Sequence, residues 1–315
     1  MVPDATFTSY YGRQVVKPSP WEADIPAYLF FGGLAAGSSL LAAGADLTDR
    51  PALRRAGRLG ALFAITASMG ALVHDLGRPE RFLNMLRTAK LTSPMSVGTW
   101  ILTGYGPFAG GAAAAELLGM LPATRSGPLS RVVPLGRPLG VVSALLAPPV
   151  AAYTAVLLAD TATPSWHDAY RELPFVFVGS AASASGGLGM ICSPVGQAGP
   201  ARRMALGGAL LELAAEHRME GTMGLTAEPL HQGKAGVFMR ASKALTVAGA
   251  VGSLLAGRSR LAAVMSGAAL MAGSVCTRFG VFEAGQQSAR DPKYTVLPQR
   301  ERLERGQPVR SDQPA

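Results

Sequence analysis

The sequence has few of the residues that usually hold metal ions and redox centres. It contains only two cysteines, Cys192 and Cys276, which are far apart and do not belong to a CxxC pair. Iron–sulfur clusters are held mainly by sets of thiolates, and structural zinc sites use comparable ligand sets. This chain alone therefore provides neither kind of site, and we interpret both cysteines as packing residues.

Histidine is scarce as well, since the chain has only His74, His167, His217 and His231. No predicted helix carries two of them within the membrane, as a bundle that binds several b-type haems would need. One pair between helices, His74 with His217, stays open as an alternative. We expect no haem, no iron–sulfur cluster and no metal site in this chain.

Charged residues are the third shortage. They make up 16% of the chain, whereas soluble domains have about 25%. Hydrophobic residues make up 49%, and the mean hydropathy is positive at +0.25, which together indicate an integral membrane protein. The net charge of +9 lies largely in arginines of short loops and of residues 290–310. This distribution suits the headgroups of a lipid bilayer, and we expect no nucleic-acid partner.

Long runs without charge predict membrane-spanning helices, because about 20 helical residues cross the hydrocarbon and a helix satisfies its own backbone. The runs are continuous rather than alternating, which disfavours a β-barrel. We predict an all-α integral membrane bundle of about eight transmembrane helices in two four-helix halves. Residues 1–24 and 284–315 would lie outside the membrane domain, which covers residues 25–283. The four strong runs are Ile25–Ala45, Leu91–Ala115, Pro138–Ala159 and Leu173–Ala201. Four weaker runs, each shortened or interrupted by ionisable residues, are Gly57–Leu76, Met204–His217, Gly236–Gly257 and Leu261–Phe282.

The N-terminal residues lack the basic start, apolar core and cleavage site of a signal peptide, so we expect an uncleaved first span. An even number of spans places both termini and the even-numbered loops on one face. The other face has more basic residues, which predicts that it is cytoplasmic and that the termini lie on the outer face of a cell membrane. Its arginines are mostly bare, and they are Arg50, Arg54, Arg55, Arg58, Arg125, Arg131, Arg137, Arg202, Arg203, Arg258 and Arg260.

The outer face gathers a different set of polar residues, which we interpret as a candidate site. An imidazole with a carboxylate nearby can donate a proton and hydrogen-bond a redox carbonyl. Two alternatives stay open: a histidine that stabilises a helix C-terminus, and aromatic side chains that anchor helix ends at the headgroups. The candidates are Glu22 and Asp24 before the first span, His74 and Asp75 at the end of the second, Trp100 near the start of the third and Tyr153 near the end of the fourth.

A polar segment separates the second and third spans. Gly77 and Pro79 are expected to end the second helix. Residues 79–89 mix apolar and basic side chains, which favours a short helix along the interface. Pro94 then follows a break, and Ser96 can cap the next span.

Three ionisable residues fall inside predicted spans and are candidates for proton transfer. Glu212 lies near mid-membrane and Glu216 follows one turn later on the same face. Buried carboxylates can relay protons, although a tilted or half-inserted span would instead leave both wet. Arg278 follows a long uncharged run and should need a partner, for which Asp75 and Glu283 are candidates.

One string between residues 75 and 100, DLGRPERF…SPMSVGTW, resembles the signature of the NrfD family, which includes the membrane subunit of polysulfide reductase. Further blocks extend the resemblance along nearly the whole chain. They are WEADIPAYLFFGGLAAGSSLL, YTAVLL, WHDAYRELPFVFVGSAASASGG and RFGVFEAGQQSARDPKYTVLPQRERL.

The resemblance implies a membrane subunit that exchanges electrons with a quinone, menaquinone or ubiquinone. It also implies docking of a ferredoxin-like four-cluster iron–sulfur subunit, itself attached to a molybdopterin-type catalytic subunit. The family's quinone pocket lies at the outer face among the first four helices. Its span-four tyrosine corresponds to Tyr153, whereas Glu22 and Asp24 are approximate stand-ins for an Asn and a His of relatives.

Two functions of different classes follow. The first is a quinone-interacting subunit of an oxidoreductase complex, without catalytic residues of its own, in which protons are also translocated or handled. The second is a redox-inactive membrane anchor for the iron–sulfur and molybdopterin subunits. A secondary transporter is disfavoured because the sequence has no internal repeat with paired broken helices.

Overall fold

The computed structural model describes residues 14–78, 80–122 and 128–305, and these ranges contain eleven α-helices and no β-strand. The predicted all-α fold is confirmed for this part of the chain. Each predicted run overlaps one helix of twenty or more residues, but the run Leu173–Ala201 is too long, because its helix ends at Cys192 and the next begins at Gly199. These long helices are α1 (Asp24–Leu47), α2 (Pro51–Asp75), α4 (Pro94–Met120), α5 (Gly136–Ala159), α7 (Leu173–Cys192), α8 (Gly199–Met223), α9 (Gly233–Leu255) and α10 (Arg260–Arg290).

Five helical segments of the described residues are long and apolar enough to cross a membrane. They are Asp24–Leu47, Pro51–Asp75, Val133–Ala159, Leu173–Cys192 and Arg260–Arg290. Helices α4, α8 and α9 have similar lengths. Ionisable residues interrupt α8 and α9, and α4 is rich in glycine and alanine.

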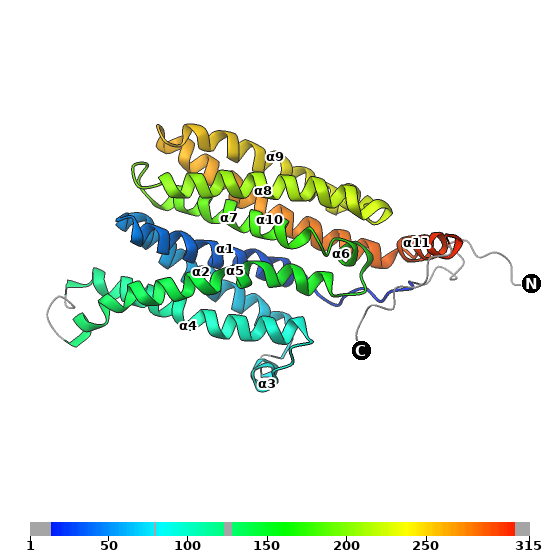
Figure 1. Ribbon diagram of the computed structural model, residues 1–315, viewed down its shortest axis with the longest axis horizontal. Coiled ribbons are helices and arrows are strands. Elements are labelled where there is room, and N and C mark those ends of the chain that lie inside the picture. Colours follow the sequence, from blue (N-terminus) through cyan, green and yellow to red (C-terminus); the bar gives the residue numbers. More distant parts are fainter. Residues whose placement is uncertain (1–13, 79, 123–127, 306–315) are drawn as a thin grey trace, which may run out of the picture.

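The long helices run up and down the bundle, and the short helices lie at one end of it (Figure 1). The short helices are α3 (Arg81–Arg87), α6 (Pro164–Asp168) and α11 (Lys293–Glu304). The position of α3 confirms the helix expected within residues 79–89. We call this the terminal end of the bundle.

The cap of α4 differs from the prediction. Ser93, not Ser96, occupies the N-cap, and its hydroxyl accepts the Ser96 N–H at 3.5 Å. The Ser96 hydroxyl instead donates to the Thr88 carbonyl at 3.0 Å and accepts the Lys90 N–H at 2.9 Å. Pro94 fits the first helical position because it lacks the N–H that would be unsatisfied there. Ser96 therefore holds the preceding loop against the helix.

We describe the long helices as two groups according to their contacts (Figure 1). Helix α1 packs on α2 and α5, and α4 packs on α5; in the other group α7 packs on α8 and α10, and α9 on α10. The groups meet mainly where α7 contacts α1 and α5. Glycines allow the closest approaches: a Cβ on Gly179 of α7 would lie 2.6 Å from the backbone nitrogen of Glu212 in α8.

The arginines opposite the terminal end were predicted to be mostly bare, but several of them have partners. Arg54 and Arg58 of α2 form ion pairs with Glu116 of α4 and Asp46 of α1. Sequence inspection missed these pairs because the carboxylates lie in different spans from the arginines. Arg260 also has partners, since its guanidinium donates to the Met190 and Ser193 carbonyls near the C-terminus of α7 at 2.8 Å.

Candidate functional site

A narrow cleft opens among the first four long helices at the terminal end of the bundle. It encloses about 40 Å³, which is room for about one or two water molecules. Its walls are mainly apolar, with two tyrosines, one tryptophan, one threonine and one carboxylate. The lining residues are Trp21, Ile25, Tyr28, Leu72, Asp75, Leu76, Met85, Met95, Thr99, Leu102, Tyr153 and Leu157. We call it the tyrosine cleft.

Two tyrosine hydroxyls meet at the cleft. The hydroxyls of Tyr28 in α1 and Tyr153 in α5 hydrogen-bond each other, and both side chains are buried. The Tyr153 ring fits because Gly98 of α4 has no side chain: a Cβ there would lie 2.5 Å from Cε2 of the ring. The SVGTW segment therefore contributes space to the site through its glycine.

The adjacent residues His74 and Asp75 separate in space. Asp75 lines the cleft, where it receives a backbone hydrogen bond from Glu22. The His74 side chain is 80% exposed and its Nδ1 lies 2.9 Å from Oδ2 of Asp24. His74 and Asp24 thus tie the end of α2 to the start of α1, outside the cleft lining. The Glu22 side chain is exposed, and only its backbone takes part.

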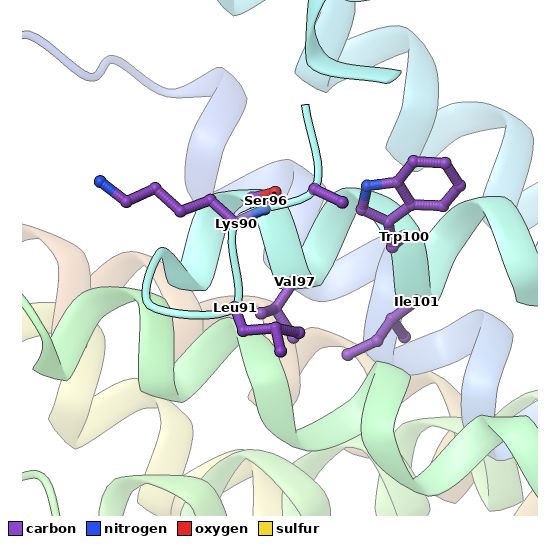
Figure 2. Close-up of a pocket in the computed structure, with 7 residues that line it drawn as sticks. Lys90, Leu91, Ser96, Val97, Trp100 and Ile101 are labelled. Carbon is purple, nitrogen blue, oxygen red and sulfur yellow. Dashed lines mark hydrogen bonds between the residues drawn. The ribbon is translucent and has the colours of Figure 1, made fainter. Parts of the chain in front are cut away.

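Trp100 belongs to a different hollow. Its indole Nε1 donates to the Thr88 carbonyl at 3.2 Å, and the side chain is partly exposed. Figure 2 shows Trp100 and Ile101 on α4 facing the loop that carries Lys90 and Leu91. Trp100 therefore packs against the loop after α3 rather than in the tyrosine cleft.

A second polar cluster lies between α7, α8, α9 and α10. Glu212 is fully buried and accepts hydrogen bonds from Thr277 at 2.6 Å and from Ser183 at 3.3 Å. Glu216 is 1% exposed, and the Lys243 ammonium lies 3.5 Å from its carboxylate and 2.8 Å from that of Glu220. The alternative in which Glu212 and Glu216 are both wet is wrong, because neither is exposed. We call these side chains of α8 with Lys243 the carboxylate ladder.

Arg278 is buried at the junction of α1, α7 and α10. Its Nη2 donates to the Phe177 carbonyl at 2.8 Å, and its guanidinium stacks 3.8 Å from the centre of the Phe177 ring. Among the described residues it forms no ion pair with Asp75 or Glu283, so the predicted pairing is wrong. The partner is a carbonyl and an aromatic face of α7, which no charge pattern in the sequence could reveal.

Sequence inspection missed Tyr28, Glu220 and Lys243 as members of these clusters. A signal existed for the first two: Tyr28 lies four residues after Asp24, and Glu220 four residues after Glu216, so each shares a helix face with a residue already singled out. Lys243 could not be assigned, because its partners come from another helix.

Comparison with known proteins identifies the family. The sequence profile described as "Polysulphide reductase, NrfD" matches residues 13–196, which include α1 to α7. The C subunit of the polysulfide reductase of Wolinella succinogenes is 32% identical over 180 residues, which are 53% of this chain and 57% of that relative. The sequence thus aligns with a little over half the length of this relative. On the profile match, this multi-pass membrane protein belongs to the NrfD polysulphide reductase family.

Proposed function

We propose that the chain is the membrane subunit of a polysulfide-reductase-like oxidoreductase complex and exchanges electrons between the quinone pool and an iron–sulfur partner subunit. The family match supports this, as does the tyrosine cleft. In this proposal all eight long helices cross the membrane, in the two packed groups described above. The termini lie on the outer face, and residues 25–283 form the membrane domain.

The tyrosine cleft is the single observation that carries the proposal. A quinone headgroup needs apolar walls for its ring and hydrogen-bond donors for its carbonyl oxygens. The cleft offers apolar walls and the hydroxyls of Tyr28 and Tyr153, with the Asp75 carboxylate beside them. When a quinol is oxidised, both electrons pass to the partner subunit and both protons must leave; Asp75 would accept one of them.

The cleft must open to admit a ring, because about 40 Å³ is less than a quinone headgroup occupies. Met85 of α3 and Met95 of α4 line it, and their unbranched side chains can take other rotamers without moving the bundle. Only one of the two tyrosine hydroxyls donates in their mutual hydrogen bond, so the other keeps a proton that it can donate to the ligand.

The partners in this proposal are a ferredoxin-like four-cluster subunit, attached to a molybdopterin-type catalytic subunit. The loop between α2 and α4, with α3, is the proposed docking segment. The carboxylate ladder and Arg278 are proposed to handle protons within the second group of helices. Glu212, Glu216 and Glu220 follow one another at four-residue intervals, so their side chains lie along one face of α8.

The test is steady-state quinol oxidation or quinone reduction by the purified complex. Tyr153→Phe removes one hydroxyl and Asp75→Asn removes the proton acceptor. Each should lower turnover by about ten- to a hundred-fold, with assembly unchanged, because each removes a hydrogen bond to a group that gains charge. His74→Ala is the control, since His74 lies outside the cleft lining. Equal activity of Tyr153→Phe and wild type would place the reaction elsewhere.

A membrane anchor without quinone chemistry is the second candidate. The observation that favours it is the mutual hydrogen bond of Tyr28 and Tyr153, which leaves the closed cleft small. Under this function, changes in the loop between α2 and α4 should abolish docking of the soluble subunits, whereas Tyr153→Phe and Glu212→Gln should leave every activity of the complex unchanged.

A further inference from the structure

A polar hollow lies at the end of the bundle opposite the terminal end, where α1 and α4 end and where α2 and α5 begin. It has a volume of about 400 Å³. Arginines dominate its polar lining, and its other walls include Met120 and Val133. The charged lining residues are Asp46, Arg54, Arg55, Arg58, Glu116 and Arg137.

The two carboxylates of the hollow are already neutralised by Arg54 and Arg58. Arg58 lies 3.0 Å from both Asp46 and Glu116, and Arg54 lies 2.9 Å from Glu116. The side chain of Arg58 is 7% exposed, and its Nε has no hydrogen-bond partner among the described residues. The hollow therefore contains a buried guanidinium whose donors are not all used.

Two arginines remain in excess. Arg55 is 3.6 Å from Glu116, a carboxylate that two closer arginines already share, and its side chain is 48% exposed. Arg137 is exposed and forms no ion pair with another described residue. The hollow thus has an uncompensated positive charge, held by two planar guanidinium groups that favour bidentate binding of phosphate oxygens.

An apolar stripe runs from this charge along the outside of the bundle. Val141 and Leu145 follow Arg137 at intervals of four residues on α5, and both are exposed, Leu145 at 72%. Leu117 and Met120 of α4 are exposed beside the hollow. In a membrane-spanning helix, residues exposed in this way face lipid, so a headgroup at the arginines would have its acyl chain beside Val141 and Leu145.

We propose that this hollow binds the phosphate headgroup of an anionic phospholipid, with Arg55 and Arg137 as the phosphate ligands. Arg58 and its two carboxylates fix the shape of the site, and α5 supports one acyl chain. Phosphate chemistry alone would also fit a free anion, but the apolar stripe beside the arginines favours a lipid. The site requires that these helices cross the membrane; it does not depend on quinone chemistry in the tyrosine cleft.

The experiment measures lipid retention by native mass spectrometry on the full-length protein, purified and stripped of lipid. Phosphatidylglycerol and phosphatidylcholine with identical acyl chains are titrated separately. We expect one phosphatidylglycerol to be retained, and the double variant Arg55→Gln, Arg137→Gln to bind it about thirty-fold more weakly, because two surface charges are lost. The matched control is Arg203→Gln, Arg258→Gln, which removes two exposed arginines from the same end but away from the hollow.

Three results would overturn the proposal. The first is equal retention of both lipids by the wild type. The second is equal loss of phosphatidylglycerol in the two double variants, which would mean that general charge attracts the lipid. The third is displacement of the lipid by inorganic phosphate at equal concentration, which would assign the site to a free anion. The variant Arg55→Lys, Arg137→Lys keeps the charge and should retain the lipid better than the glutamine variant.

Discussion

The two groups of helices bury polar side chains in different ways. The first group places the hydroxyls of Tyr28 and Tyr153 in a cleft that has a carboxylate, Asp75, at its edge. The second group buries a row of carboxylates on α8, which accept hydrogen bonds from serine and threonine hydroxyls and pair with the Lys243 ammonium. Neutral hydrogen-bond donors beside a cleft are typical of a site for a small ligand. A row of buried carboxylates is typical of groups that bind and release protons.

The family match covers the first group of helices and α7 of the second. The profile ends at residue 196, so it includes the tyrosine cleft and excludes α8, α9 and α10. The carboxylate ladder therefore has to be interpreted from its own chemistry. One contact between the matched and unmatched parts of the chain is at Phe177 of α7, whose carbonyl accepts a hydrogen bond from Arg278 of α10. A change in one region can reach the other through this contact.

The largest effect is expected from filling the cleft. Gly98→Ala adds a Cβ that would lie 2.5 Å from Tyr153, so the ring has to move. Quinone turnover should fall by about a hundred-fold, as is typical when a positioning group shifts by about 1 Å. Gly104→Ala on the same helix is the matched control, because no atom lies within 4 Å of its added Cβ. Steady-state turnover is measured for both variants. An equal loss of turnover in the two would mean that the tyrosine cleft is not the site of the reaction.

Much of the fold could be predicted, because the signals are local. Each long helix coincides with a run of residues that has few charges, and Gly77, with its positive φ, and Pro94 bound the segment between α2 and α4. Tyr153 was found through the family motif, and Asp75 through its place at a helix end. The partners were not predictable: Tyr28 with Tyr153, Arg278 with Phe177 and Arg58 with Glu116 are pairs that helix packing creates. Sequence spacing shows which face of a helix a residue occupies, but not which helix faces it.

The second prediction concerns the carboxylate ladder. Glu212→Leu removes the acceptor for Thr277 and Ser183 and leaves buried hydroxyls with one partner fewer. The free energy of unfolding should fall by about 1–3 kcal/mol, measured by thermal or denaturant unfolding. Glu212→Gln keeps an acceptor oxygen and should lose less. If the tyrosine cleft works independently of the carboxylate ladder, both variants should bind quinone normally. The number of protons moved across the membrane per electron should fall in both.

A result in which Glu212→Gln abolishes quinone binding would contradict the separation of the two regions. The variant Arg278→Lys then tests whether charge or packing couples the two regions. It keeps the positive charge near the carboxylate ladder but loses the stacking on Phe177. Loss of quinone binding in that variant alone would assign the coupling to the contact between α7 and α10.

The smallest effect is expected at the attachment of α11, where the paired charges are only partly buried. Lys293 lies 2.5 Å from Glu228 in the segment between α8 and α9, and Tyr294 donates to the same carboxylate at 3.3 Å. The ammonium lowers the pKa of Glu228, and the carboxylate raises the pKa of Lys293. The lowered pKa of Glu228 stabilises the attachment above the ordinary carboxyl pKa of 4.5, and this contribution is lost as pH falls below it. The raised pKa of Lys293 has the opposite sign, so its contribution is lost only above the ordinary value of 10.5.

The measurement is amide hydrogen exchange of residues 293–304, corrected for the intrinsic chemical exchange rate at each pH. Protection of these amides should be constant between about pH 5 and pH 9 and weaker below about pH 4. Glu228→Gln should remove the acid-dependent part, because it leaves no carboxylate to protonate. Glu301→Gln is the control, since Glu301 pairs with Arg305 within α11 and its immediate end and has no part in the attachment. An acid transition that persists unchanged in Glu228→Gln would mean that other carboxylates, and not this ion pair, govern how α11 is held.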